Sequence, residues 1–155
     1  MEFDRDRSEI AQLILEVLPL TMRVLAAKMR DARHGLSTAH LPTLAALDYK
    51  PHTQRELAEM MSVSGATMSN TLSTLEARGW IHRQRSQEDR RLILIEITED
   101  GRTVLHESLE DMEIQIQQLL VGLDEHQDEQ LKQGLIILRS VFARALGDIG
   151  SSKDA

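Results

Sequence analysis

The sequence predicts a mainly α-helical protein with one small β-hairpin, an α+β fold. Three observations lead to this prediction. A helix-start signal at residue 53 is followed, after a short turn, by a second short helix. A glycine then separates that helix from two short segments rich in β-branched residues. The last third of the chain carries apolar residues at heptad spacing, which predicts long helices that pack on other helices.

The N-terminal part of the chain is predicted to hold one long and one short helix. Apolar residues at helical spacing run from Ser8 to about Ala32, and we expect Pro19 to kink this helix or split it in two. The short helix is expected to begin at Ser37 or His40. Its inward residues are predicted to be Leu41, Leu44, Ala45 and Leu47.

Residues 53–78 are predicted to form a helix-turn-helix. Thr53 and Glu56 have the spacing of a capping box, which starts the first helix. A tight turn ends at Ser64, a good N-cap for the second helix, Gly65 to Arg78. The residues that the first helix should turn inward are Leu57, Ala58 and Met61.

The second of these helices is predicted to present unusually small side chains to the outside. At about 100° per residue, its packing side carries Met68, Leu72 and Leu75, and its opposite side carries Ala66, Asn70, Ser73 and Ala77. Small polar residues let a helix lie deep in the DNA major groove, and an asparagine can pair with adenine through two hydrogen bonds. The alternative is an ordinary helix whose exposed face is rich in serine and threonine.

A basic hairpin is predicted to follow. Gly79 has the place of the glycine that commonly ends a helix. Residues 80–85 and 92–97 read as strands around a polar turn, 86–91. Residues 78–91 hold five arginines against two acidic side chains, a local charge of +3 in a chain of net charge −7. Such a hairpin can contact DNA phosphates or a narrow minor groove, and the alternative is a solvated hairpin with surface arginines.

Four segments of the sequence carry a more specific signal. They are Val63 to Ser69, Leu75 to Gly79, Asp89 to Arg91 and Ile97 to Gly101. Together, and above all through Asp-x-Arg in the hairpin and Thr-Glu-x-Gly after it, they resemble the MarR family of bacterial transcription regulators. The resemblance covers nearly the whole chain. It implies a winged helix-turn-helix with N- and C-terminal dimerisation helices and sequence-specific binding to double-stranded DNA.

The resemblance also implies which residues meet DNA. Ser64, Thr67, Ser69 and Asn70 would be contacts of the recognition helix. Arg91 would be the wing arginine, with the Asp89 carboxylate orienting it. The full predicted DNA-binding set is Thr53, Gln54, Ser64, Thr67, Ser69, Asn70, Ser73, Arg83, Arg85, Asp89, Arg90 and Arg91.

Composition limits the other classes. The 155 residues include 25 acidic and 18 basic side chains, and the acidic surplus falls in residues 98–155, away from the predicted DNA-binding segment. The absence of cysteine excludes disulfides, zinc–thiolate sites and thiol redox sensing. With no signal peptide and no apolar run near eighteen residues recognised, we expect a cytoplasmic protein without membrane contact.

Two apolar seams predict a helical hairpin near the C-terminus. The first is Leu105, Leu109, Met112, Ile116, Leu119 and Leu123, and the second is Leu131, Leu135, Leu138, Phe142, Ala145 and Ile149. These helices could pack within a monomer, but pairing with a second copy is the favoured hypothesis. Residues 1–36 and 102–155 are then the dimerisation region and residues 37–101 the DNA-binding lobe of one continuous domain. A dimer would place its recognition helices about 34–36 Å apart on a pseudo-palindrome.

No enzyme active site or cofactor site can be read from the sequence. His106 and Glu110 lie one helical turn apart, and His34 or His40 could complete a metal site with them, so a metal-responsive regulator is one alternative. The acidic stretch 124–129 is more simply the start of a helix.

The resemblance further implies a repressor released by a small anionic or phenolic effector. The predicted effector-binding residues are Met22, Arg23, Met29 and His40. A winged-helix subunit that binds protein instead of DNA is the other alternative.

Overall fold

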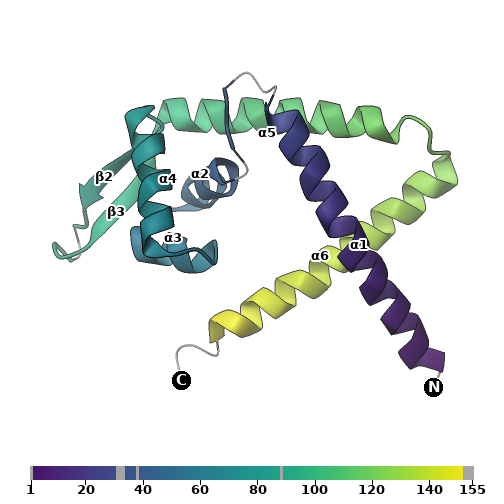
Figure 1. Ribbon diagram of the computed structural model, residues 1–155. Coiled ribbons are helices and arrows are strands. Elements are labelled where there is room, and N and C mark those ends of the chain that lie inside the picture. Colours follow the sequence, from purple (N-terminus) through teal and green to yellow (C-terminus); the bar gives the residue numbers. More distant parts are fainter. Residues whose placement is uncertain (1, 31–33, 38, 88, 152–155) are drawn as a thin grey trace. The chain divides into compact units, whose positions relative to one another are not determined.

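The computed structural model describes residues 2–30, 34–37, 39–87 and 89–151 (Figure 1). Its elements, in chain order, are α1 (Glu2–Arg30), α2 (His40–Tyr49), β1 (His52–Thr53), α3 (Gln54–Met60), α4 (Gly65–Ala77), β2 (Ile81–Arg85), β3 (Ile93–Ile97), α5 (Glu99–Leu120) and α6 (Glu125–Ser151). The chain divides into two compact units, residues 1–115 and residues 116–155. The predicted fold class, mainly helical with a small antiparallel sheet, is confirmed.

Helix α1 is a single continuous helix. It begins before the predicted Ser8, and the predicted end at Ala32 lies outside the described residues. Pro19 lies inside the helix, so the predicted split into two helices does not occur. A proline removes one backbone hydrogen bond, and the other bonds of a helix this long keep it continuous.

The sequence was expected to hold no apolar run near eighteen residues, and α1 shows that this expectation was wrong. Over Asp6–Lys28, 23 residues with a mean hydropathy of 1.7, the helix is long and apolar enough to cross a membrane by length and composition. This is a weak indication, because helices packed inside soluble proteins pass the same test. The charged residues of α1 lie mostly at its two ends, and between residues 10 and 27 only Glu16 and Arg23 are charged.

Helix α2 begins at His40, one of the two predicted starts. The Ser37 carbonyl accepts the His40 backbone N–H at 3.0 Å. Ala45 was predicted to pack inward but is exposed, because it lies about 200° around the helix from the buried Thr43 and Leu47. The residues of α2 that do pack inward are Thr43, Leu44 and Leu47, with Leu41 and Ala46 half-buried.

Helices α3 and α4 form the predicted helix-turn-helix, and α4 lies beside the β2–β3 hairpin (Figure 1). The capping box is present, since the Thr53 backbone N–H donates to Glu56 Oε2 at 2.6 Å and the Glu56 backbone N–H donates to Thr53 Oγ1 at 3.3 Å. Gly79 ends α4 at a φ of +74°, where glycine is favoured. The predicted inward residues are confirmed: Leu57, Ala58, Met68, Leu72 and Leu75 are buried, and Met61 packs against them.

The sheet has three antiparallel strands where two were predicted. Their order is β1-β3-β2, so the short β1 pairs with the far side of β3. In this pairing His52 lies opposite Ile95 and Thr53 opposite Leu94. A two-residue strand has no alternating pattern, so the sequence could not predict it. The predicted hairpin is present, with Ile81 opposite Ile97 at its base.

The start of α5 packs closely against the hairpin. Thr98 Oγ1 donates to the Gly79 carbonyl at 2.7 Å and accepts the Gly101 backbone N–H at 3.0 Å. A Cβ on Gly101 would lie far inside van der Waals contact with the Trp80 carbonyl oxygen and 2.8 Å from Ile97 Cγ1. The Thr-Glu-x-Gly motif is therefore a helix start that leaves room only for glycine.

Residues 116–155 hold the end of α5, a turn and α6. Asp124 Oδ1 accepts the Gln127 backbone N–H at 2.8 Å, which confirms the predicted helix restart at Asp124. The side chain of Ile149, the last residue of the predicted seam, lies outside the described residues. The large apolar side chains of this unit that stay exposed in the single chain include Ile116, Leu119, Leu123, Leu131, Leu135 and Phe142.

Candidate nucleic-acid interface

The outward face of α4 consists of small side chains, as predicted. Met68, Leu72 and Leu75 hold the opposite face in the core. The exposed residues of the outward face are Ala66, Thr67, Asn70, Ser73, Thr74 and Ala77, with Ser69 half-buried at its edge. The absence of long side chains on this face lets the α4 backbone approach another surface closely.

Several hydroxyls of α4 are occupied by the helix itself. Ser64 Oγ accepts the Thr67 backbone N–H at 3.1 Å and lies 2.9 Å from Thr67 Oγ1. Thr74 Oγ1 donates to the Asn70 carbonyl at 3.0 Å. Ser64 and Thr67, predicted DNA contacts, therefore also cap the helix, and the exposed Asn70 and Ser73 are the better candidates for reading bases.

The two predicted contacts at the start of α3 have structural partners. Thr53 forms the capping box with Glu56, and its hydroxyl also donates to Glu56 Oε2 at 2.9 Å. Gln54 Nε2 donates to the Gly65 carbonyl at 3.2 Å, which joins the first turn of α3 to the first turn of α4. Thr53 thus caps α3, and Gln54 braces the helix-turn-helix.

The tip of the hairpin presents three exposed arginines, Arg85, Arg90 and Arg91. Asp89 was predicted to orient Arg91, and its carboxylate contact is with the backbone: Oδ1 accepts the Arg91 N–H at 2.9 Å. The turn is closed by a bond from the Ser86 N–H to the Leu92 carbonyl at 3.0 Å. Glu88, predicted within the same turn, lies outside the described residues.

Arg83 has a different environment from these three arginines. It lies opposite Ile95, on the strand face that also carries the buried Ile81, and its Nε donates to Glu76 Oε2 at 3.1 Å. The pair joins β2 to α4, a contact that sequence reasoning missed. The signal was available, because residues 81, 83 and 85 alternate onto one face of a strand.

Arg78, counted in the basic cluster, is also held within the protein. Its Nη1 donates to the His34 and Gly35 carbonyls at 3.1 and 3.2 Å. Its guanidinium also lies over the Trp80 ring, 4.8 Å from the ring centroid. Arg78 is exposed, but these contacts direct its guanidinium onto the protein, so the arginines at the hairpin tip are the better candidates for DNA contacts.

Among the residues that the structure describes, no hydrogen bond or ion pair links the predicted effector-binding residues to one another. Met22 and Arg23 are exposed on α1, and the side chain of Met29 lies outside the described residues. His40 is half-buried, and its Nδ1 accepts the Ser37 backbone N–H at 3.3 Å. Burial, and then the nearby Arg78 charge, lower the pKa of His40, which favours the neutral ring.

The residues considered for a metal site form two separate pairs. His34 Nε2 lies 2.6 Å from Glu107 Oε2, and His106 Nε2 lies 3.4 Å from Asp48 Oδ2. Glu110, the predicted partner of His106, is exposed. Within the described ranges, no group of three or more His, Asp or Glu side chains could hold a metal ion.

Comparison with known proteins gives consistent matches. The MarR family model matches residues 34–92. The chain is 31% identical over 136 residues to the organic hydroperoxide resistance transcriptional regulator of Bacillus subtilis, covering 86% of this chain and 89% of that protein. It is 29% identical over 120 residues to the transcriptional repressor MprA of Escherichia coli, covering 76% of this chain and 66% of MprA.

Solved structures share the fold. Apo MarR from E. coli superposes with a TM-score of 0.74 at 21% identity, covering 83% of this chain and 94% of that chain. FabT from Streptococcus pneumoniae, solved in complex with DNA, superposes with a TM-score of 0.66 at 20% identity, covering 89% and 98%. The chain therefore belongs to the MarR family of winged helix-turn-helix proteins and is a DNA-binding transcription regulator, not an enzyme.

Proposed function

We propose that this regulator is a homodimeric repressor that binds a pseudo-palindromic operator in double-stranded DNA and leaves it when a small ligand binds. Two features of the structure support the proposal. The side chains around Asn70 on the outward face of α4 are small and exposed, and the neighbouring hairpin has three exposed arginines at its tip. The helix fits the major groove, where an asparagine amide can read adenine. The arginines fit phosphates or a narrow minor groove.

The exposed apolar helices support the homodimer. Eight large apolar side chains of α1, from Ile10 to Val24, are at least 39% exposed in the single chain. Leu135 and Phe142 of α6 are 55% and 41% exposed. Apolar surface on this scale is unusual for a monomer, and a second copy would cover it. A two-fold dimer also accounts for a palindromic site, with half-sites about 34–36 Å apart.

Two further parts of the proposal rest on the family. Relatives such as MprA are named repressors, and we extend this role to the present chain. One relative regulates organic hydroperoxide resistance, but this chain has no cysteine, so a thiol cannot be its sensor. We therefore favour a non-covalent anionic or phenolic effector acting on a soluble, cytoplasmic protein, with Met22, Arg23, Met29 and His40 as the first residues to test.

Any effector must bind one arrangement of the two DNA-binding lobes better than the other, because only a difference in affinity can shift the population. The arrangement that binds the effector better would have its recognition helices at a spacing that does not fit both half-sites. Release then needs only a change in separation, without unfolding of either lobe.

The test is selection from a randomised pool of double-stranded DNA at several salt concentrations. We expect a palindrome with half-sites about one helical turn apart and a steep loss of affinity with salt, because phosphate contacts release counterions. Enrichment of no sequence by the wild-type protein, both as purified and after refolding free of small molecules, would contradict the operator proposal. It would favour a protein-binding role instead.

A further inference from the structure

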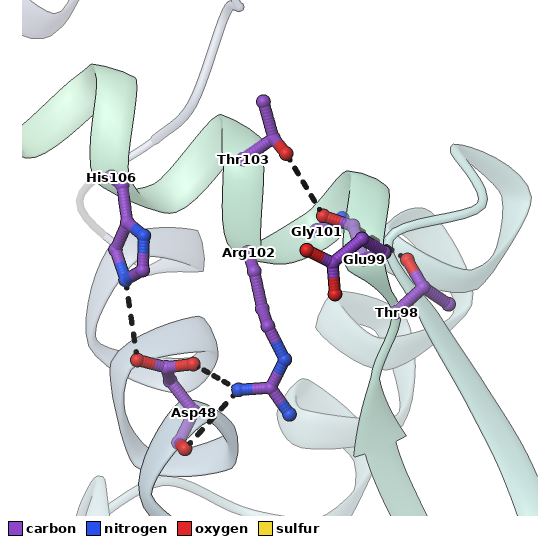
Figure 2. A network of polar contacts seen from close by, with 7 residues as sticks. All are labelled: Asp48, Thr98, Glu99, Gly101, Arg102, Thr103 and His106. Carbon is purple, nitrogen blue, oxygen red and sulfur yellow. Dashed lines mark hydrogen bonds and ion pairs between the residues drawn. The ribbon is translucent and has the colours of Figure 1, made fainter.

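A cluster of charged side chains joins α2 to α5 (Figure 2). Asp48, in the last turn of α2, forms an ion pair with Arg102 on α5. Arg102 Nη1 also lies 3.4 Å from the Asp48 carbonyl oxygen, and His106 Nε2 lies 3.4 Å from Asp48 Oδ2. One residue of α2 is thus held by two successive turns of α5.

The position of Asp48 calls for an explanation beyond helix stability. A carboxylate in the last turn of a helix faces the negative end of the helix dipole, which is unfavourable. Arg102 compensates for this by contacting both the Asp48 carboxylate and its main-chain carbonyl. The Asp48 side chain is 29% exposed and the Arg102 side chain 40%, so solvent weakens the pair less than it weakens a fully exposed one.

We propose that Asp48, Arg102 and His106 are positioning residues that fix the angle at which α5 leaves the DNA-binding lobe. They would thereby set the spacing of half-sites that the dimer accepts. The inference rests on the dimeric operator reader proposed above. These three residues would help to determine which operators the dimer binds without contacting DNA themselves.

Apolar packing alone would not fix this angle. Val104 and Leu105 bury the start of α5 in the core, but burial of apolar area is non-directional and tolerates rotation of a helix on its neighbours. Charge-assisted hydrogen bonds have preferred lengths and angles. The contacts to Asp48 therefore select one orientation of α5 among those that the core would allow.

The length of α5 makes its orientation matter. Its 22 residues span about 33 Å at about 1.5 Å per residue. A tilt of about 10° would move the far end by about 6 Å, whereas one base-pair step is about 3.4 Å. Small changes of the angle at Asp48 would therefore move a half-site by more than one base pair.

Other contacts link α5 to the lobe when the Asp48 cluster is broken. His34 Nε2 lies 2.6 Å from Glu107 Oε2, in the same turn of α5 as His106, and the His34 carbonyl accepts a hydrogen bond from Arg78 of the lobe. Thr98 and Gly101 also still anchor the first turn of α5 to the hairpin. Asp48→Asn should for this reason leave the lobe folded and change only its angle to α5.

The experiment measures the affinity of the full-length protein for operators whose half-sites are separated by the selected spacer, by one or two base pairs more, and by one or two fewer. A single half-site is measured as well. For Asp48→Asn we expect the preference for the selected spacer over its neighbours to fall about tenfold, with half-site affinity unchanged, because an ordered arrangement that favoured binding is lost.

Controls separate positioning from stability. Glu110→Gln removes an exposed carboxylate from the same helix and should leave the spacer preference unchanged. Arg102→Gln removes the ion pair that Asp48→Asn also removes but leaves the His106 contact, so it should reproduce most of the Asp48→Asn loss. The double variant should lose no more than Asp48→Asn alone, because Asp48 takes part in both contacts. Asp48→Glu keeps the charge and should recover part of the preference.

Two results would overturn the inference while leaving the operator proposal in place. One is an unchanged spacer profile in Asp48→Asn and Arg102→Gln. The other is an equal loss on every operator and on the single half-site. A wild-type protein that binds a half-site as well as any paired operator would instead contradict the dimeric operator reader itself.

Discussion

Asn70 and Arg91 illustrate two different demands on side chains that meet DNA. Asn70 is exposed on a helix whose neighbouring hydroxyls bond to their own backbone, so its amide is the polar group best suited to select a base. Arg91 is exposed on a turn that the Asp89 carboxylate holds through the backbone N–H. The turn fixes where the Arg91 guanidinium starts from, and the flexible side chain can then reach a phosphate.

Substitutions at these two positions should therefore change different properties: overall DNA affinity for Arg91 and base selectivity for Asn70. Arg91→Ala is expected to weaken binding on all sequences alike and to reduce the salt slope by about one per arginine removed. Asn70→Ala is expected to cost about 1–3 kcal/mol on the preferred base and to relax selection at one position in each half-site. Titrations across salt and repeated selections distinguish these outcomes. The same change in selectivity for both variants would refute the division of roles.

Gly101 is a residue that the fold requires for its size. Gly101→Ala should destabilise the protein by about 1–3 kcal/mol, because the added Cβ would meet the Trp80 carbonyl and Ile97, neither of which can move aside easily. Thermal unfolding measures the effect. Gly65→Ala is the control, since a Cβ there has nothing within 4 Å and should leave stability unchanged or raised. Equal melting temperatures for both variants would contradict the packing account.

The strand β1 and the first turn of α3 contain two titratable side chains, His52 and Glu56. Protonation of each should lower the stability of the protein in a different pH range. Burial lowers the pKa of His52, and the nearby Lys50 adds to this while Glu56 opposes it. The pKa of Glu56 is itself lowered, chiefly by the hydrogen bond from the Thr53 backbone N–H. Acid should therefore weaken this corner in two stages, first through the histidine and then through the carboxylate.

The sign of the histidine effect follows from its lowered pKa. Above about pH 6.5, the usual value for histidine, the ring is neutral in both the folded and the unfolded state. As the pH falls below that value, the unfolded chain takes up the proton more readily, so the free energy of unfolding decreases. Urea unfolding between pH 7.5 and 5 should record this decrease, with His40 adding to it because burial lowers its pKa as well.

His52→Gln is predicted to reduce this pH dependence. The matched control is His126→Gln, on the exposed first turn of α6, which should leave the slope as it is in the wild type. An identical slope in His52→Gln would mean that the buried ring is not what couples stability to pH. Loss of the capping box appears separately, below the ordinary pKa of a glutamate near 4.3.

At the scale of the whole molecule, the sequence predicted what local chemistry determines. The caps at Thr53 and Ser64, the glycine at position 79 and the buried side of α4 all follow from short patterns, and each was confirmed. It could not predict contacts between residues far apart in the chain, such as Asp48 with Arg102 or Arg78 with the His34 carbonyl. No spacing rule joins such pairs, because the tertiary fold creates them.

The exposed apolar helices outside the DNA-binding lobe lead to a prediction about the proposed homodimer. Leu135 is 55% exposed and lines a groove of about 340 Å³ with Leu120, Leu131 and Ile136 in the unit formed by residues 116–155. If a second copy covers this surface, Leu135→Glu places a charge in an apolar interface, which is costly. Sedimentation should then show a monomer of 17.6 kDa where the wild type is a dimer.

The same variant should lose cooperative binding to the full operator while keeping the weaker binding of one half-site, because the core of the lobe, with Leu44, Leu57 and Leu72, is formed within one chain. Gln130→Glu adds the same charge five residues earlier, about 140° around α6 from Leu135, and should leave both the dimer and the operator affinity intact. In the wild type, the melting temperature should rise with protein concentration, as it does when folding is linked to association. A dimer that persists in Leu135→Glu would mean that α6 faces solvent, and α1 would then be the helix to test.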